Sequence, residues 1–428
     1  MPNKSFYFLN LGCPKNQTDG DYVRGALNDL GLSEMDAPDD VDYIFINTCA
    51  FIEQARLETR GEIDQLLPYK KNGTELIALG CYPALTDIKK EIPVIDAAFR
   101  FDQLAKVIEY VAGIKDYCYQ PRISHRVIND LPYAYVNISD GCDNRCSYCT
   151  IPQIRGHYRS RPPDKLIEEV DYLASNGIKE IVLVAQDSAI YGRDLEPNID
   201  LPWLCGKIAA IDGIDWIRIM YAHPAHLDPA MLDRLYATDK VCRYLDLPIQ
   251  HISDNILTRM RRHCDSGQIK RLINHLRKLD KNISLRTTLM VGFPGETDDD
   301  YQKLVEFVEE SEFDHLGVFQ YSPEVNTAAY DLDGRVNPEL AEERYELLYD
   351  IAADISQDRS RTFIGRSEKL LIDGLTIDDG YYEARSYRQA PEIDTMYKVE
   401  SEFELMPGQF IMAKITEIDE AGAIKISD

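Results

Sequence analysis

The chain has 428 residues, 44% of them hydrophobic, which is enough to bury two or three cores. No apolar run approaches the roughly 20 residues of a membrane-spanning helix, and residues 1–20 carry no secretion signal. The net charge of −26 disfavours broad attraction to nucleic-acid phosphates and favours a basic partner, although solubility alone would account for it equally well. Ten cysteines without an export signal favour a reducing compartment, so we expect a cytoplasmic protein with no membrane partner.

Three short apolar runs in the first hundred residues, "FYFLNLGC", "YIFINTC" and "LIALGC", have β character and are separated by stretches long enough for helices. Each run ends in a cysteine, namely Cys13, Cys49 and Cys81. Strands of a parallel sheet end at one edge, so these cysteines should converge. A single such cysteine would most simply be a buried thiol. Because three occupy equivalent positions, we interpret them as a three-thiolate cluster site.

From Tyr133 onward the strand-then-helix pattern resumes with six candidate strands, "YAYVNISDGC", "EIVLVAQD", "WIRIMYAHP", "YLDLPIQH", "SLRTTLMVGFPGE" and "HLGVFQYSP". This repetition predicts a parallel, barrel-like sheet. We expect one helix to be capped by Asp164 and ended by Gly177, and a later helical stretch to break near Gly267. A charged helix over about 337–362 should precede a small all-β module with glycine turns.

The stretch "GCDNRCSYCTIP" places Cys142, Cys146 and Cys149 in a C-x3-C-x2-C pattern after the first of these strands. Three closely spaced thiols are typical of a metal site, but structural zinc and most iron-sulfur clusters take four protein ligands. The nearest fourth candidate is His157, in the basic loop "IRGHYRSRP", which makes zinc the weaker interpretation. The motif is one ligand short.

Here the sequence resembles the radical S-adenosylmethionine enzymes, whose C-x3-C-x2-C loop holds a 4Fe-4S cluster by three cysteines. The resemblance implies that S-adenosylmethionine occupies the fourth iron and is cleaved to a 5′-deoxyadenosyl radical. It also implies cofactor contacts at Gln186, after the second strand, and in the turn "VGFPGET", at Gly292, Gly295 and Glu296. The glycines would equally fit an ordinary tight turn that is followed by a helix capped by Thr297 and Asp300.

The three-cysteine domain ahead of the barrel, with "LNLGCPKN", "INTCAFI" and "LGCYPA", resembles the methylthiotransferases, and the resemblance covers nearly the whole chain. It implies a second 4Fe-4S cluster on Cys13, Cys49 and Cys81 whose open iron carries the transferred sulfur. One S-adenosylmethionine would donate the methyl group and another would supply the radical. Because the cofactors carry the chemistry, no catalytic side chain is assigned. The expected fold is α/β: a Rossmann-like methylthiotransferase domain over 1–118, a partial (β/α)6 radical core over 128–362 and an all-β TRAM domain over 363–428.

Two branches of this family differ in substrate: MiaB-like enzymes modify isopentenyl-adenosine in tRNA, and RimO-like enzymes modify the β-carbon of an aspartate in the twelfth small-subunit ribosomal protein. Residues 365–428 contain 7 Lys and Arg against 14 Asp and Glu, a net charge of −7 that suits a basic protein better than tRNA. The stretches "ARSYRQAPEID" and "GCDNRCSYCTIPQIRG" also resemble the RimO branch. We therefore expect the ribosomal protein as substrate, a flavodoxin- or ferredoxin-type electron donor as partner, and no tRNA.

A non-catalytic iron-sulfur carrier would account for six cysteines but not for the barrel or the β-module. Some residues stay outside these assignments. His223 and His251 end barrel strands and either line the pocket or bond backbone carbonyls. Arg155 lies in a basic loop and either steadies a carboxylate or is solvated. The other cysteines match no ligand spacing and are expected to be ordinary ones: Cys118, Cys205, Cys242 and Cys264.

Overall fold

The computed structural model describes residues 4–71, 73–114, 123, 126–375, 380–401, 403–418 and 424–427. The chain forms two compact units. The first comprises Met1–Asn129, Tyr135–Asp143 and Cys149–Arg159, and the second comprises Asp130–Ala134, Asn144–Tyr148 and Ser160–Asp428. Cys118 lies outside the described residues.

The first unit is built on a parallel five-stranded sheet in the order β2-β1-β3-β4-β5. Its strands are β1 (Ser5–Asn10), β2 (Ser33–Glu34), β3 (Tyr43–Thr48), β4 (Glu75–Gly80) and β5 (Ala97–Arg100), and its main helices are α1 (Pro14–Asp29), α2 (Glu53–Leu66) and α5 (Leu104–Ala112). Three of these strands are the predicted ones, and β2 and β5 are short additions at the edges.

Both faces of this sheet are buried, as expected for parallel strands with crossover helices. Phe45 on β3 packs on one face with side chains of α1 and α5, and its neighbours Ile44 and Ile46 pack on the other with α2. The alternation follows from the two-residue period of a strand. With both faces covered, the edge at the carboxyl ends of the strands is left for the loops.

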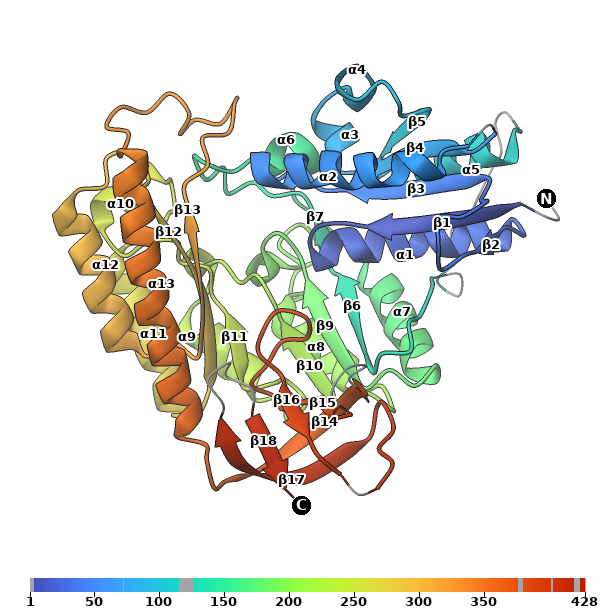
Figure 1. The fold of residues 1–428 in the computed structure, drawn as a ribbon. Helices are drawn as coiled ribbons and strands as arrows, with labels where there is room; N and C mark the ends of the chain where they lie inside the picture. The colour runs from blue at the N-terminus through green and yellow to red at the C-terminus, as the bar shows by residue number, and fades with distance from the viewer. Residues whose placement is uncertain are drawn as a thin grey trace. The chain divides into compact units, whose positions relative to one another are not determined.

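All six predicted barrel strands are present. Five lie in the second unit, namely β9 (Glu180–Val184), β10 (Trp216–Ile219), β11 (Tyr244–Asp246), β12 (Ser284–Val291) and β13 (His315–Gln320), and β6 (Tyr133–Asn137) begins in it. They form two three-stranded sheets, β10-β9-β6 and β11-β12-β13, and a bridge between Ile217 and Val241 links β10 to the chain just before β11. Figure 1 shows the helices between them on the outside of the strands, α12 (Asp298–Ser311) among them. This arrangement confirms the predicted α/β barrel-like core.

One local expectation was wrong. Helix α7 (Pro163–Ser175) has Pro162 as its N-cap residue, so Asp164 lies in the first turn and accepts no capping hydrogen bond. A proline suits a helix start because it donates no backbone hydrogen bond. The later helical stretch does break near Gly267, as expected, into α10 (Asp254–Arg259) and α11 (Ser266–Leu279), and Asp265 caps the second helix. The capping box of Thr297 and Asp300 is confirmed.

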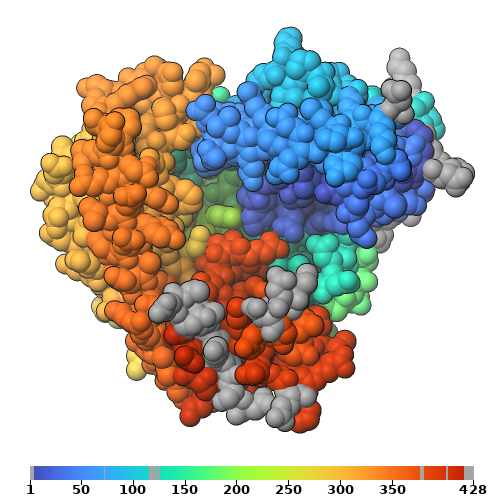
Figure 2. All heavy atoms as spheres, in the orientation of Figure 1, coloured from blue at the N-terminus to red at the C-terminus, as the bar shows by residue number. Residues whose placement is uncertain are grey.

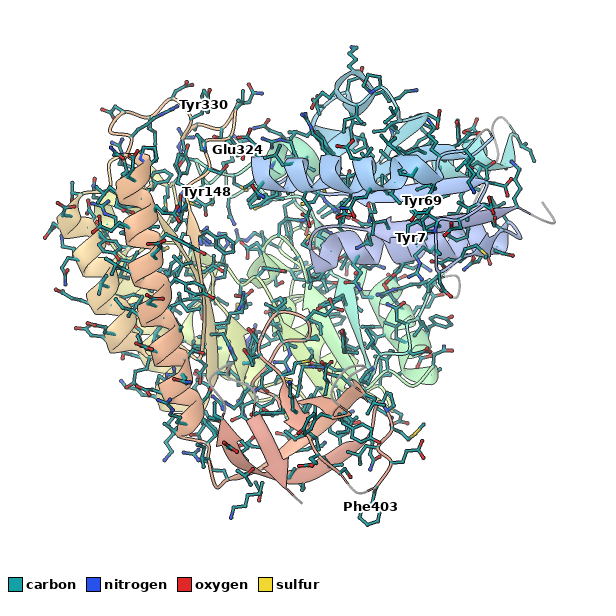
Figure 3. All side chains as sticks on the ribbon, in the orientation of Figure 1. Tyr7, Tyr69, Tyr148, Glu324, Tyr330 and Phe403 are labelled. Carbon is teal, nitrogen blue, oxygen red and sulfur yellow. The ribbon has the colours of Figure 1, made fainter. Side chains whose placement is uncertain are left out.

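Helix α13 (Pro338–Arg361) matches the predicted charged helix and is capped by Asn337. It lies against β13 and α12, and its outward side chains form part of the surface seen in Figure 2. A closed barrel in the order β14-β15-β16-β18-β17 follows, which confirms the all-β module. Its strands are β14 (Ser367–Leu375), β15 (Tyr382–Arg385), β16 (Tyr397–Val399), β17 (Phe410–Ile418) and β18 (Ile424–Ser427). Phe403 projects from this module into solvent (Figure 3).

Among the described helices, none combines the length and the apolar composition that a membrane span requires.

Candidate active site

In the first unit, three cysteines follow parallel strands at the same sheet edge. Cys49 and Cys81 directly follow β3 and β4, and Cys13 lies three residues beyond β1. Burial, with a smaller contribution from charge on Cys13 and Cys81, raises the pKa of the Cys49 thiol to about 11, so Cys49 lies within electrostatic reach of the other two sulfurs. Thiolates this close repel unless a cation lies among them, and a metal cluster supplies that cation.

Close backbone packing sets the position of this cysteine group. Gly12 has φ +90°, and a Cβ added there would lie 2.8 Å from Cys49 Cβ. Gly80 has φ +92°, and its added Cβ would lie 2.4 Å from Asn47 Oδ1. Only glycine tolerates both the left-handed backbone and the close approach. The turns before Cys13 and Cys81 are therefore fixed by the glycines that precede them.

A buried arginine contacts one of these cysteines, and a buried lysine shares one of its carboxylate partners. Arg155, with 1% of its side chain exposed, has one guanidinium nitrogen 2.6 Å from Asp19 and the other 3.5 Å from the Cys81 sulfur. Lys15 is similarly buried and contacts Asp140 at 2.6 Å. Burial raises the pKa of the Cys81 thiol, and the charge of Arg155 opposes that rise. Arg155 is therefore the neighbour that favours an anionic sulfur at Cys81, against the larger effect of burial.

The loop with the C-x3-C-x2-C motif is tied down on both sides of its first cysteine in the first unit. The Cys142 backbone N–H donates to the Gly156 carbonyl at 3.1 Å. Gly141 has φ +73°, and an added Cβ would lie 2.1 Å from the His157 carbonyl oxygen, so a larger residue would push the two chain segments apart. His157, the candidate zinc ligand, is exposed and bonds Asp143 instead.

In the second unit, the turn after α10 holds the middle of the same loop. Buried Arg262 donates to the Cys146 sulfur and to the Tyr148 hydroxyl, each at 3.3 Å, and Tyr148 is labelled in Figure 3. The Ser147 backbone N–H donates to the Met260 carbonyl at 2.9 Å, and His263 bonds the Asn144 carbonyl at 3.0 Å. A guanidinium on the sulfur favours the thiolate that a metal requires.

The predicted cofactor contact Glu296 is buried and bonded within its own turn. Its carboxylate accepts from the Gly292 backbone N–H at 3.1 Å and from Arg344 at 2.6 Å. His251 Nε2 lies 3.5 Å from the same carboxylate. Glu296 therefore closes the glycine turn, and its contact with the cofactor stays a prediction.

Both glycines of that turn are required by packing. A Cβ on Gly292 would lie 2.8 Å from Ala341 Cβ, and one on Gly295 would lie 2.5 Å from Arg259 Nε. The Gly295 backbone N–H donates to the Gly334 carbonyl at 2.7 Å. These contacts account for the glycines without a ligand, so the adenosyl contact at Gly292 and Gly295 also stays a prediction.

Polar groups collect where β9 and β10 end in the second unit. The Gln186 side-chain oxygen is buried and has no hydrogen-bond partner among the described residues, which leaves it available to a ligand donor. Next to it, Asp187 bonds His226 Nδ1 at 2.7 Å and Asn144 at 2.8 Å. The side chains of Asp187, His223 and His226 offer ligand atoms within 4.8 Å of one another.

This group of three fits hydrogen bonding better than a metal ion. His223 Nδ1 accepts from the Ala225 backbone N–H at 3.1 Å, so the neutral ring carries its proton on Nε2. Burial, with help from the charge of Arg262, lowers the pKa of His223 far below its ordinary value and keeps the ring neutral. A protonated Nε2 cannot ligate a metal and presents a donor instead.

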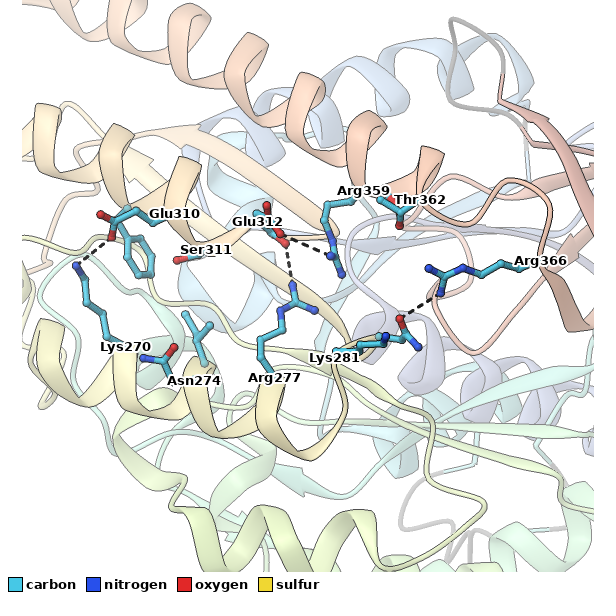
Figure 4. A pocket seen from close by; sticks show the side chains of 13 residues that line it. Lys270, Asn274, Arg277, Lys281, Glu310, Ser311, Glu312, Arg359, Thr362 and Arg366 are labelled. Atoms are coloured by element: carbon cyan, nitrogen blue, oxygen red, sulfur yellow. Dashed lines mark hydrogen bonds and ion pairs between the residues drawn. The ribbon is translucent and has the colours of Figure 1, made fainter.

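A pocket of about 500 Å³ lies on the outside of the second unit, where α11, α12 and α13 end (Figure 4). Its basic lining residues are Lys270, Arg277, Lys281, Arg359 and Arg366. Arg277 and Arg359 bind the buried carboxylate of Asp314, each at 3.3 Å, and Arg277 also donates to the Glu312 carbonyl at 2.8 Å. These two arginines therefore stabilise helix ends. We assign the pocket no part in the chemistry at the cysteines.

Sequence reasoning left Arg155 undecided, did not single out Arg262, and gave no role to the Asp187 and His226 pair. The only sequence signal for the two arginines was their place in polar loops next to the cysteine motif or to a barrel helix. Their sulfur partners lie 74 and 116 residues away, and no local pattern reports contacts at that separation.

Comparisons with known proteins agree with this geometry. Three family models match the chain: the radical SAM superfamily over residues 136–308, the uncharacterized protein family UPF0004 over 5–100, and the TRAM domain over 364–422. The chain is 39% identical to the ribosomal protein uS12 methylthiotransferase RimO of Lachnoclostridium phytofermentans, over 97% of this chain and 98% of that protein. It is 37% identical to the RimO of Aquifex aeolicus, over 96% and 94% of the two chains.

Solved structures share the fold at low sequence identity. The radical S-adenosylmethionine methyltransferase TsrM of Kitasatospora setae, with cobalamin and a [4Fe-4S] cluster bound, aligns with a TM-score of 0.58 at 15% identity and covers 77% of each chain. The cobalamin-dependent radical enzyme OxsB aligns with a TM-score of 0.51 at 12% identity, over 81% of this chain and 56% of that one. Both alignments bear on the fold alone.

Proposed function

Because the chain belongs to the RimO family of radical S-adenosylmethionine methylthiotransferases, we propose that it methylthiolates the β-carbon of an aspartate in ribosomal protein uS12. The family carries a 4Fe-4S cluster and S-adenosylmethionine, and these groups supply the radical chemistry when bound. The observation that carries the proposal is the similarity over the whole chain length, which includes the domain ahead of the radical core.

Cys142, Cys146 and Cys149 would hold the radical cluster, and Cys13, Cys49 and Cys81 a second one. Support for the second site comes from three cysteines at equivalent strand ends, with buried Arg155 at the sulfur of one of them. Cluster sulfurs are normally tuned by hydrogen bonds and nearby charge, and Arg155 offers both. The chain's part in the reaction is to hold both sites and orient the target C–H bond.

S-adenosylmethionine would be held at Gln186 and along the turn of Gly292, Gly295 and Glu296. The unpartnered Gln186 oxygen supports a donor group of the cofactor there. The salt bridge between Glu296 and Arg344 would keep the turn in one conformation before the cofactor binds. Binding would therefore cost less conformational entropy of the turn.

The acidic C-terminal module supports a basic protein substrate. Its net charge of −7 would attract a ribosomal protein and repel RNA phosphates. The proposal also includes a cytoplasmic enzyme that receives electrons from a flavodoxin- or ferredoxin-type protein and does not act on tRNA. Its domains would be the methylthiotransferase domain over 1–118, the radical core over 128–362 and the TRAM domain over 363–428.

The test is mass spectrometry of ribosomal proteins and of tRNA from a strain that lacks this gene. We expect uS12 to lose the mass of one methylthio group while tRNA modification is unchanged. Complementation with Cys146→Ala should fail, and Cys205→Ala, which alters a buried cysteine in α8 (Leu201–Ala209) outside both motifs, should restore the modification. Loss of methylthio from tRNA with uS12 still modified would contradict the proposal and favour the MiaB-like function.

A further inference from the structure

Arg155 ends helix α6 (Ile151–Arg155), directly after the C-x3-C-x2-C motif, yet its side chain reaches a cysteine of the other motif. We propose that Arg155 is a positioning residue for the site of Cys13, Cys49 and Cys81, where its guanidinium holds the Cys81 sulfur and raises the reduction potential of the cluster bound there. This inference rests on the proposed second cluster.

Four contacts hold the guanidinium in one place. One nitrogen lies 2.6 Å from Asp19 and 3.5 Å from Asp140, and the other donates to the Cys81 sulfur at 3.5 Å. The group also lies over the ring of Phe101, 4.0 Å from its centroid. A guanidinium has a rigid, planar set of donors, so fixing one edge on the carboxylates aims the other edge at the sulfur.

The carboxylates alone do not explain this arrangement. Lys15 and Arg155 balance Asp19 and Asp140, and the ionic cluster would be neutral without any sulfur contact. Cys81 therefore receives a hydrogen bond that the charge balance does not require. Hydrogen bonds to sulfur and nearby positive charge both stabilise the reduced, more negative form of a cluster.

The position of Arg155 depends on the loop of the other motif. The next residue, Gly156, accepts the backbone hydrogen bond of Cys142 at 3.1 Å. Asp140, two residues before Cys142, binds both Lys15 and Arg155. Adjacent residues of one short segment thus contact a cysteine of each motif, so folding of the C-x3-C-x2-C loop places the guanidinium at Cys81.

Arg126 provides a matched control in the same unit. Its side chain is 3% exposed, it lies 3.5 Å from Asp21, and it donates to the Tyr135 carbonyl at 2.6 Å. It therefore resembles Arg155 in burial and in having a carboxylate partner, but its hydrogen bond goes to a backbone carbonyl where that of Arg155 goes to a sulfur.

The experiment uses the full chain with Cys142→Ala, Cys146→Ala and Cys149→Ala, so that only the N-terminal site binds iron. After anaerobic reconstitution, the midpoint potential is measured by a redox titration followed by electron paramagnetic resonance. We expect Arg155→Met to shift the potential to more negative values, Arg155→Lys to shift it less, and Arg126→Met to leave it unchanged. Iron content and circular dichroism accompany each titration.

An unchanged potential in Arg155→Met, at the iron content of the parent, would overturn the inference. If Arg155→Met stays folded but loses iron while Arg126→Met keeps it, the positioning role is supported. If both variants lose iron, the effect is one of folding and the inference fails. A parent that binds no iron would instead defeat the proposed second cluster itself, and this outcome is distinct from the others.

Discussion

Two buried ionic clusters in this protein have the same composition and different surroundings. In the first unit, Lys15 and Arg155 face Asp19 and Asp140 beside the sulfur of Cys81. In the second unit, the buried cations are Arg218 and Arg385 and the carboxylates are Glu180 and Asp373. No cysteine sulfur accepts a hydrogen bond in the second cluster among the described contacts. The two clusters thus balance charge in the same way and differ in the hydrogen bond to a cysteine sulfur.

The second cluster joins the barrel to the C-terminal module. Glu180 begins β9 and contacts Arg218 on β10 and Arg385 on β15, each at 2.6 Å, with all three side chains fully buried. Nearby charges of Arg218 and Arg385 outweigh burial and lower the pKa of Glu180. Glu180 therefore pairs with two buried cations at once, and without it Arg218 would lose its carboxylate partner while Arg385 would keep Asp373.

The largest effect on stability is expected from Glu180→Ala. Removing a carboxylate that pairs with two buried arginines should destabilise the second unit by about 3–5 kcal/mol, because Arg218 stays buried without its carboxylate and Arg385 keeps only Asp373. Urea unfolding measures the change, and Glu168→Ala, which breaks an exposed pair with Lys165, should leave the unfolding midpoint almost unchanged. Equal effects of the two substitutions would contradict the structural role of the junction.

A smaller effect is expected from Asp300→Asn, at a site where hydrogen bonds rather than ion pairs hold a carboxylate. The Ser253 and Thr297 hydroxyls and the Thr297 backbone N–H donate to Asp300; together they outweigh burial and lower its pKa to about 2. The substitution should cost about 1 kcal/mol at neutral pH.

The pH dependence of this effect follows from the direction of the pKa shift. A carboxylate with a lowered folded-state pKa stabilises the fold above its unfolded value near 3.8, and the contribution is lost as the pH falls through about 2. The difference in unfolding free energy between Asp300→Asn and the parent should therefore shrink between pH 4 and 2. A difference that grows on acidification would show that the carboxylate is not the group responsible.

The smallest effect is expected at the surface of α12. Lys303 and Asp299 form a pair one helical turn apart, at 2.5 Å, and both side chains are more than half exposed. Lys303→Ala should leave the midpoint of urea unfolding almost unchanged, because water screens the pair. A loss of unfolding free energy as large as that of Glu180→Ala would contradict the expected difference between buried and exposed ion pairs.

The sequence predicts the parts of the fold that repeat. Six barrel strands and three cysteines at strand ends follow from periodicity, because parallel strands end together whatever their side chains. Helix starts were predictable where a polar cap was present, as at Thr297, and not where Pro162 begins the helix.

The surroundings of the cysteines could not be predicted in the same way. Arg155 and Arg262 contact sulfurs far away in the sequence, and nothing local distinguishes them from solvated loop residues such as Arg159. The His223 tautomer depends on a backbone N–H that only the folded turn presents. Such contacts arise from tertiary packing, and the local patterns of a single sequence do not report them.

The central claim is that two separate three-cysteine sites each hold an iron-sulfur cluster, and an iron count on anaerobically reconstituted protein tests it most directly. We predict about eight iron atoms per chain for the parent and about four for each triple variant, Cys13→Ala, Cys49→Ala, Cys81→Ala and Cys142→Ala, Cys146→Ala, Cys149→Ala. The control with Cys205→Ala and Cys242→Ala should keep about eight. About four iron atoms in the parent, unchanged in the N-terminal triple variant, would contradict the claim.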